Sequence, residues 1–194
     1  MKRNEHSVND APLPTREGPR VRLAFPRESD GPELIALYRA SRTFYRGLAY
    51  PFVTPEGFAR YLERCRGPGN FVGLLLRRRS DGVILGSINV SEIVRGLFQS
   101  AYLGYQIGAP FARQGYMTEG LDLALHYAFV RLKLHRLEAN IQPENQPSLA
   151  LVRRLGFTYE GLSRRYLKIG GRWRDHERWA ILAEDWQRRK ERRS

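Results

Sequence analysis

Three consecutive strand patterns, joined by tight turns, restrict the folds open to this chain more than any other feature. Each is rich in apolar residues, and turn signals separate them at Asp81-Gly82 and Arg95-Gly96. After the third, apolar residues recur with helical spacing over 118–132. The sequence therefore predicts an antiparallel meander that leads into a long helix. The three strand segments are 70–78, 83–94 and 99–107.

The other predicted elements complete a mixed α/β fold. Single strands are expected at 21–25 and 136–141, and a hairpin is expected around Gly170-Gly171. The order β, α, α, β, β, β, α, β, α, β, β predicts a mixed sheet of seven strands, mostly antiparallel, with helices on both faces. The hairpin strands are 157–169 and 172–182, and the remaining helices are 29–38, 54–65 and 148–155.

The length of 194 residues fits a single domain, which we place at 20–185. Residues 1–19 are polar and contain three prolines, so we expect a flexible N-terminal extension. Residues 186–194 are expected to form a basic C-terminal tail. The chain shows neither a membrane span nor the apolar core of a signal peptide, which predicts a cytoplasmic protein without a membrane partner.

Charge is the most unusual part of the composition. There are 33 Lys and Arg residues against 20 Asp and Glu residues, a formal net charge of +13. A basic surface attracts polyanions such as nucleic acid, acidic protein or a phosphorylated cofactor, although a solvated, arginine-rich surface explains the same numbers. Cys65 is the only cysteine, which excludes an internal disulfide. The four histidines lack metal-ligand spacing, so no metal is expected.

The segment 105–119 carries the clearest chemical signal. A strand ends, a short loop follows, and a long helix begins after Gly115. Such a loop directs successive backbone N–H groups at one point, and the helix adds the positive end of its dipole, which suits a pyrophosphate. Gly115 allows a positive φ or a close approach of phosphate, and Arg113 adds a charge. The spacing excludes a Walker A loop and a dinucleotide-binding fingerprint.

A second polar segment follows the strand 136–141. Asn145 can close a turn there, and Ser148 can open a helix that Gly156 ends. Capping alone accounts for both residues, so this segment indicates chemistry only in combination with the first.

Together, the two segments resemble the Gcn5-related N-acetyltransferase (GNAT) superfamily over about residues 20–185. The superfamily loop reads Gln/Arg-x-x-Gly-x-Gly/Ala; here Gly115 matches, while Ala112 and Met117 depart from it. Within the superfamily, the chain is similar to the RimJ branch of ribosomal-protein-alanine N-acetyltransferases. The segments that carry this similarity, in order, are 94–96, 102–105, 115–119, 145–148, 155–161 and 171–176.

The resemblance implies a GNAT fold whose sheet splays between strands four and five and binds acetyl-CoA, with CoA as product. The pantetheine arm then pairs with the strand edge at Tyr105, Gln106 and Ile107, and the amide of Ile107 or of a neighbour serves as an oxyanion hole. Asn145 would orient the cofactor or Ser148. The residues implied at the pyrophosphate are Arg113, Gln114, Gly115, Tyr116, Met117 and Thr118.

Candidate acid and base groups complete the mechanism. An α-amine has a pKa of about 8, so a carboxylate acting through water suffices as general base. Glu92, at a strand end, is the candidate; Asp175 and His176 are weaker ones, which could instead bind the substrate terminus or hold the hairpin. Many members carry a tyrosine as acid where this chain has Val152, so Ser148 is the expected donor to the departing thiolate.

Three functional classes stay open. The first is acetylation of a protein N-terminal α-amine, where the basic surface favours a ribosome-associated target. The second is acetylation of a small amine or amino-sugar, and the third is a non-catalytic ribosome- or RNA-associated factor on the same fold. In this superfamily the region of the aromatic run 44–52 shapes the acceptor site, which predicts a substrate contact from Tyr45 or Tyr50; the alternative is a hydrophobic cluster without contact to substrate. Both a monomer and a homodimer are compatible with the sequence.

Overall fold

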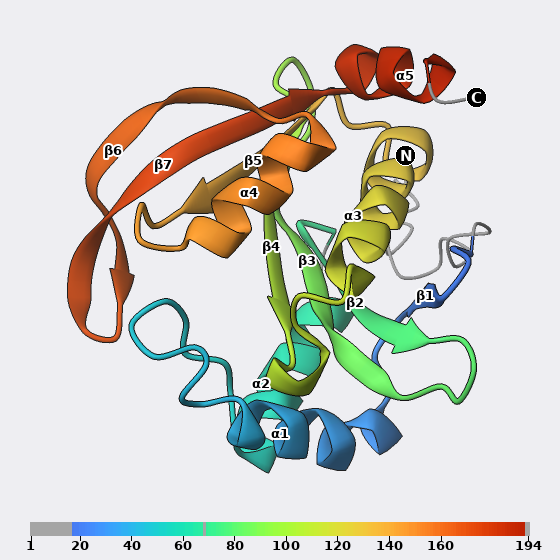
Figure 1. Ribbon diagram of the computed structural model, residues 1–194, viewed down its shortest axis with the longest axis vertical. Coiled ribbons are helices and arrows are strands. Elements are labelled where there is room, and N and C mark those ends of the chain that lie inside the picture. Colours follow the sequence, from blue (N-terminus) through green and yellow to red (C-terminus); the bar gives the residue numbers. More distant parts are fainter. Residues whose placement is uncertain (1–16, 68, 193–194) are drawn as a thin grey trace, which may run out of the picture.

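The computed structural model describes residues 17–67 and 69–192, which form one sheet with helices packed on both faces (Figure 1). The sheet has seven strands in the order β1-β2-β3-β4-β5-β7-β6, so the predicted fold class is confirmed. The strands are β1 (Val21–Ala24), β2 (Phe71–Arg78), β3 (Ile84–Val94), β4 (Ser100–Ile107), β5 (Arg136–Ile141), β6 (Thr158–Ile169) and β7 (Arg172–Leu182).

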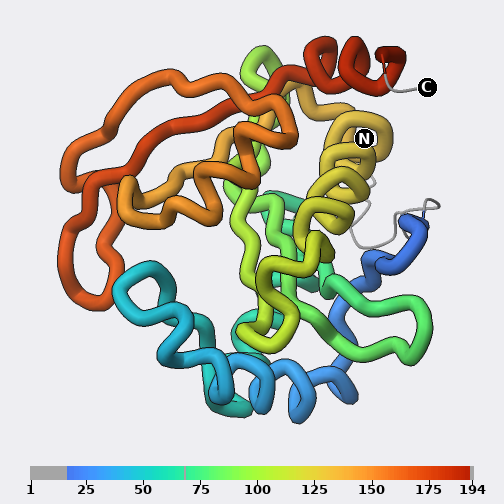
Figure 2. Tube along the Cα trace, viewed as in Figure 1, coloured from blue at the N-terminus to red at the C-terminus, as the bar shows by residue number. Residues whose placement is uncertain are grey.

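The sheet opens between β4 and β5. All other neighbouring strands are antiparallel, whereas β4 and β5 run parallel and pair only over 100–102 with 136–138. Beyond Tyr102, β4 stays paired with β3 while β5 stays paired with β7, so the two parts of the sheet diverge (Figure 2). The predicted splay between the fourth and fifth strands is confirmed.

Helices cover both faces because side chains alternate along the buried strands. On β2, Leu75 belongs to the apolar cluster of α1 and α2, whereas Leu74 and Leu76 belong to the larger cluster that contains α3 and α4. The α-helices are α1 (Gly31–Ala40), α2 (Pro55–Arg66), α3 (Tyr116–His126), α4 (Gln146–Leu155) and α5 (Ala183–Glu191). Shorter helical turns are Glu28–Asp30, Ala109–Phe111 and the π-helical Tyr127–Arg131.

Local sequence explains where the helices begin and end. The hydroxyl of Thr54 accepts a hydrogen bond from the amide of Gly57 and caps α2. Gly156 adopts a φ of +87° and ends α4. The helix α3 starts at Tyr116 rather than at 118, because Gly115, with a φ of +81°, is its N-cap.

The C-terminal segment continues past the predicted end of the domain. The sequence predicts a boundary at 185, but α5 crosses it. The Trp186 side chain is only 8% exposed, and its ring lies 5.5 Å from that of Phe129 and 5.8 Å from that of His126. The first residues of the basic tail are therefore a helix anchored in the core.

The N-terminal extension falls mostly outside the described residues, which begin at Glu17. Glu17 forms an ion pair with Arg79 at 3.0 Å, and the Gly18 carbonyl accepts a hydrogen bond from the Arg79 guanidinium at 2.9 Å. Residues 17–19 are thus attached to the end of β2. Within the described ranges, none of the helices has the length and apolar character needed to cross a membrane.

Candidate active site at the splayed strands

One edge of β4 faces the splay. The amide of Gly108 donates to the Leu85 carbonyl at 2.8 Å, so in this antiparallel ladder Tyr105 and Ile107 direct their N–H and C=O groups away from β3. The Ile107 carbonyl accepts a hydrogen bond from the hydroxyl of Tyr45 at 2.5 Å. In the described part of the chain the N–H groups of Tyr105 and Ile107 meet no acceptor, so they are available to a ligand.

The loop before α3 presents a second set of amides. Gly115 has a φ of +81° and Arg113 a φ of +60°, and such left-handed residues turn consecutive N–H groups toward one point. None of the amides over 113–118 donates to an acceptor in the described residues. The dipole of α3 adds positive potential there. The positive φ is one of the two possibilities that the sequence allows for Gly115, and the loop is suited to an anion.

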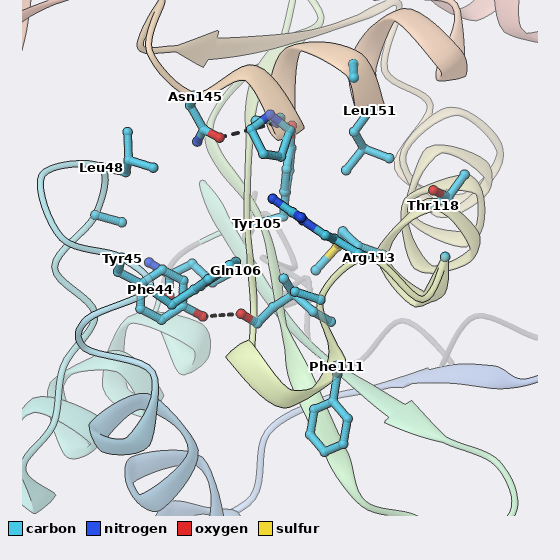
Figure 3. Close-up of a pocket in the computed structure, with 18 of the residues that line it drawn as sticks. Phe44, Tyr45, Leu48, Tyr105, Gln106, Phe111, Arg113, Thr118, Asn145 and Leu151 are labelled. Atoms are coloured by element: carbon cyan, nitrogen blue, oxygen red, sulfur yellow. Dashed lines mark hydrogen bonds between the residues drawn. The ribbon is translucent and has the colours of Figure 1, made fainter.

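A cavity of about 600 Å³ lies between these two features (Figure 3). Figure 3 shows Tyr45 and Leu48, from the segment between α1 and α2, on the opposite side of it from Arg113 and Leu151. The structure thus brings together most residues that the sequence predicts for the cofactor. Those that line the cavity are Tyr105, Gln106, Ile107, Arg113, Gly115, Met117, Thr118, Asn145 and Ser148.

Two of the predicted cofactor residues direct their side chains elsewhere. Nε2 of Gln114 donates to the Pro110 carbonyl at 2.7 Å, and the Tyr116 ring lies under the guanidinium of Arg20, 4.8 Å from the ring centroid. The backbone amides of both residues still belong to the series that meets no protein acceptor. For these two residues, only the main chain is placed to contact a ligand.

A smaller cavity of about 230 Å³ adjoins the first. The two cavities share Tyr105, Gln106 and Ser148, so they meet at the end of β4 and the start of α4. The far wall of the smaller cavity includes Asn140 of β5 and His176 of β7. Ligands bound in the two cavities would therefore meet at the splay.

Tyr105 and Ser148 are hydrogen-bonded where the cavities meet. Their hydroxyl oxygens lie 2.5 Å apart, and burial raises the pKa of Tyr105 to about 12. Tyr105 therefore keeps its proton at neutral pH and can donate to Ser148, which leaves the Ser148 proton for another acceptor. Asn145 Oδ1 accepts the amide of Ser148 at 3.3 Å, so Asn145 also caps α4.

The two cavities differ in charge. Neither is lined by an Asp or Glu of the described residues. Arg113 and Arg154 line the larger cavity, which favours an anionic ligand. In the smaller cavity, burial lowers the pKa of His176 below its ordinary value of 6.5, so this side chain is neutral at pH 7. The described residues contain no cluster of His, Cys, Asp and Glu that could hold a metal ion.

Glu92, the predicted general base, is at neither cavity, and the structure corrects this prediction. The pairing of β3 with β4 is irregular between Ser91 and Val94, where Glu92 adopts a φ of +50°. Its carboxylate forms an ion pair with Arg64 of α2 at 2.8 Å and is 56% exposed. Regular alternation along a strand does not hold across a bulge, so the sequence misplaced this side chain.

Asp175 and Tyr50 also lie outside both cavities. Oδ1 of Asp175 accepts a hydrogen bond from the amide of Arg165 at 2.7 Å, so Asp175 holds the β6–β7 hairpin, which is one of the three roles that the sequence allows. Tyr50 is 66% exposed, and its ring lies against Gly170 at the tip of that hairpin, where the two segments approach each other in Figure 2. Tyr45, in contrast, is buried and lines the larger cavity.

Sequence reasoning missed three amide side chains at the smaller cavity. Asn89 Oδ1 accepts a hydrogen bond from the Tyr61 hydroxyl at 3.0 Å, and Gln142 Nε2 donates to the Leu48 carbonyl at 2.9 Å. Asn140 Oδ1 is buried and has no partner among the described residues. The alternation along β5, whose other face is apolar and buried, is the signal that could have found Asn140.

Comparison with known proteins decides the family. The model of the acetyltransferase (GNAT) domain matches residues 20–158. The chain belongs to the GNAT acetyltransferase family. It is therefore an N-acetyltransferase with a fold that uses acetyl-CoA. This assignment does not support the alternative of a non-catalytic ribosome- or RNA-associated factor.

Three similar proteins indicate the branch of the family that the chain resembles. Probable N-acetyltransferase YjcK of Bacillus subtilis (strain 168) is 34% identical over 81% of this chain and 91% of its own length. The ribosomal protein uS5-alanine N-acetyltransferase of Escherichia coli (strain K12) is 44% identical over 53% of each chain. Mycobacterium smegmatis RimJ, solved in complex with CoA-disulfide, has a TM-score of 0.79 and 28% identity over 84% of this chain and 82% of that chain. The resemblance to the RimJ branch is confirmed.

Proposed function

We propose that this acetyltransferase transfers the acetyl group of acetyl-CoA to the N-terminal α-amine of a ribosomal protein. The observation that carries the proposal is the meeting of two cavities at Tyr105 and Ser148, one basic and one small and neutral. The 44% sequence identity with the ribosomal protein uS5-alanine N-acetyltransferase of Escherichia coli supports a ribosomal protein as the acceptor.

The residues of the larger cavity fit acetyl-CoA. The amides over 113–118 would bind the pyrophosphate, with Arg113 as a side-chain cation, and the free edge of β4 would pair with the pantetheine arm. Bound acetyl-CoA supplies an activated thioester carbonyl. The N–H of Ile107 faces the splay and would donate to the carbonyl oxygen as negative charge develops on it.

The hydroxyl pair provides a donor for the leaving sulfur. Tyr105, which stays protonated, donates to Ser148, so the hydroxyl of Ser148 donates in turn to the departing thiolate. This hydroxyl pair takes the role of the tyrosine that many family members carry at the position of Val152. Val152 itself is fully buried in the core.

The charge of the smaller cavity favours an α-amine over a polyamine. A polyamine or aminoglycoside brings several positive charges, and buried charges require paired carboxylates. The described lining of both cavities has none. A peptide N-terminus brings one ammonium, which becomes neutral when it reacts.

A basic surface near α4 and α5 supports ribosome association. Arg153 and Arg154 lie in the last turn of α4, and the last turn of α5 is also basic. Arg189 Nη2 donates to the Arg154 carbonyl at 2.6 Å, which joins the two helix ends into one surface. Such a surface would attract ribosomal RNA in a salt-dependent manner.

The test is acetylation of lysine-free decapeptides that differ in their first residue, with spermidine and an amino-sugar as competing acceptors. We expect mass spectrometry to locate the acetyl group on the α-nitrogen of a peptide. Ser148→Ala should slow the transfer, while Ser80→Ala, at an exposed turn, serves as the matched control. Transfer to spermidine or the amino-sugar in preference to every peptide would overturn the proposed acceptor.

A further inference from the structure

The transfer needs a proton acceptor, because an ammonium must lose a proton before its nitrogen can attack. Among the described residues that line the two cavities, Tyr45 and Tyr105 keep their protons at neutral pH, since burial raises the pKa of each. Arginine cannot accept a proton. His176 is the one lining side chain with an ordinary pKa near neutrality.

The hydrogen bond at Nδ1 fixes the tautomer of His176. Nδ1 lies 3.0 Å from the carbonyl oxygen of Arg174, and a carbonyl oxygen only accepts, so the ring proton is on Nδ1. The lone pair of the neutral ring is then on Nε2. In the described structure Nε2 makes no hydrogen bond, although the side chain is only 3% exposed and lines the smaller cavity. A buried base without a partner therefore lies at the wall of a ligand cavity.

Asn140 provides a second, independent indication of a ligand. Its Oδ1 is buried without a partner among the described residues. Asn140 of β5 lies opposite Arg178 of β7. His176 is two positions before Arg178, so its side chain is on the same face of the sheet, and His176 is a diagonal neighbour of Asn140. An acceptor oxygen buried in this way is costly unless a donor from a ligand reaches it.

We infer that the smaller cavity is the acceptor subsite, where Asn140 Oδ1 binds a primary ammonium and Nε2 of His176 removes its proton. The inference rests on the proposed transfer to an α-amine and deepens it. His176 contacts the reacting nitrogen and is a catalytic residue, whereas Asn140 is a positioning residue. Glu92 takes no part.

The protons and bonds balance along this route. Nε2 of His176 takes one proton from the ammonium, and the nitrogen lone pair forms the new N–C bond. The C–S bond breaks with its electron pair on sulfur. The second proton of the nitrogen passes to the sulfur through the Ser148 hydroxyl, which gives one proton and receives one. His176 then releases its proton to water, so the products are the amide, CoA and one proton.

The groups around His176 set the pH at which it works. Burial is the largest effect and lowers its pKa, while the Arg174 carbonyl, Asp175 on β7 and Glu144 before α4 act in the opposite direction. Tyr166 of β6 contacts the ring, with centroids 6.1 Å apart, and stays neutral because its pKa is raised to about 12. Tyr105 is neutral as well. The ring therefore becomes protonated, and kcat falls, only below a pH of about 6.5.

The decisive variant is His176→Asn, whose side-chain amide can still donate to the Arg174 carbonyl but has no base at the Nε2 position. We expect kcat at pH 7 to fall by about 10²- to 10⁴-fold, the usual contribution of a general base. The loss should shrink as the pH approaches 9, because an α-amine with a pKa of about 8 then deprotonates without help. The measurement is the ratio of wild-type to variant kcat from pH 6 to pH 9, at saturating acetyl-CoA and acceptor peptide.

Matched controls separate this role from a structural one. His135→Asn makes the same change at a half-exposed histidine outside both cavities and should leave the profile unchanged. Asn140→Ala should raise the KM for the peptide severalfold and leave acetyl-CoA binding intact. His176→Gln replaces His176→Asn if the latter fails to fold.

A ratio that is constant across the pH range would overturn the role of His176 as base, because a structural defect lowers the rate equally at every pH. Unchanged kcat in His176→Asn would do the same. If the wild type acetylates a small amine but no peptide, the proposed acceptor is wrong. The same pH comparison with that amine then decides the role of His176 separately.

Discussion

At the scale of single residues, the half-buried hydroxyls of Tyr105 and Ser148 are hydrogen-bonded to each other. Removing one hydroxyl removes this hydrogen bond, which typically contributes about 0.5–1.5 kcal/mol, whereas removing both leaves no hydroxyl without its partner. We therefore expect Ser148→Ala to lower the free energy of unfolding by that amount, and the double variant with Tyr105→Phe to lower it less. Urea denaturation of the two single variants and the double variant measures this; strictly additive losses would show that the hydroxyls do not interact.

The same variants test the proposed donor to sulfur. Ser148→Ala is expected to lower kcat more than it changes the KM for acetyl-CoA, because the thiolate charge exists only during transfer. Steady-state kinetics with an acceptor peptide separates the two constants. If Ser148→Ala keeps the kcat of the wild type, Ser148 is not the donor to sulfur.

Residues with a backbone role can be predicted most directly from the sequence. Gly115 follows from its place before a helix, and its φ of +81° needs no knowledge of the tertiary structure. The side chain of Glu92 cannot be placed from the sequence, because the apolar alternation does not reveal the bulge that directs its carboxylate toward Arg64. Asn140 and His176 come from strands far apart in the chain, so their meeting depends on the pairing of β5 with β7.

At the scale of elements, Trp186 is the one side chain of α5 that is buried. Trp186 is buried against Phe129 and His126, while most other residues of this helix are charged. Trp186→Ala should lower the free energy of unfolding by about 3–5 kcal/mol, the usual cost of truncating a buried tryptophan. Trp173→Ala is the matched control, because Trp173 is 60% exposed and should cost about 0.5 kcal/mol or less. Equal losses in the two variants would contradict a core role for α5.

The elements with a strong hydrophobic period can be predicted from the sequence, whereas α5 cannot. The β2–β3–β4 meander and the β6–β7 hairpin follow from alternation and turn residues, and the structure confirms them. The helix α5 has too little apolar periodicity to be recognised in the sequence, which therefore predicts a tail that includes Trp186. The position of Trp186 follows from tertiary contacts, such as those of its ring with His126 and Phe129.

At the scale of the whole molecule, the sheet consists of two parts that pair with each other over only 100–102 and 136–138. Two contacts from the segment between α1 and α2 help to hold them, Tyr45 to Ile107 and Gln142 to Leu48. A ligand bound in the splay would add a third connection. At a hundredfold excess over Kd, acetyl-CoA should add roughly 2.7 kcal/mol of stability, which for a chain of this length raises Tm by about 5–10 °C. Differential scanning calorimetry measures the shift; an unchanged Tm would mean that acetyl-CoA does not bind the folded chain.

The basic surface predicts a salt-dependent attraction at the same scale. Arg188→Gln with Lys190→Gln, both in the last turn of α5, should weaken co-sedimentation with ribosomal subunits and flatten its salt dependence. Peptide acetylation should be unaffected, because these side chains line neither cavity. Co-sedimentation that is insensitive to salt and to both substitutions would contradict an electrostatic contact.

The central claim is that the loop at Gly115 and the free edge of β4 bind acetyl-CoA in the larger cavity. Calorimetric titration of acetyl-CoA into the wild type, Gly115→Trp and Gly96→Trp tests it most directly. Gly96 also has a positive φ, but it lies in a turn away from both cavities, so this variant carries similar backbone strain without filling the site. We predict micromolar binding by the wild type and Gly96→Trp and none by Gly115→Trp. Equal binding by all three proteins, or binding by none, would contradict the account.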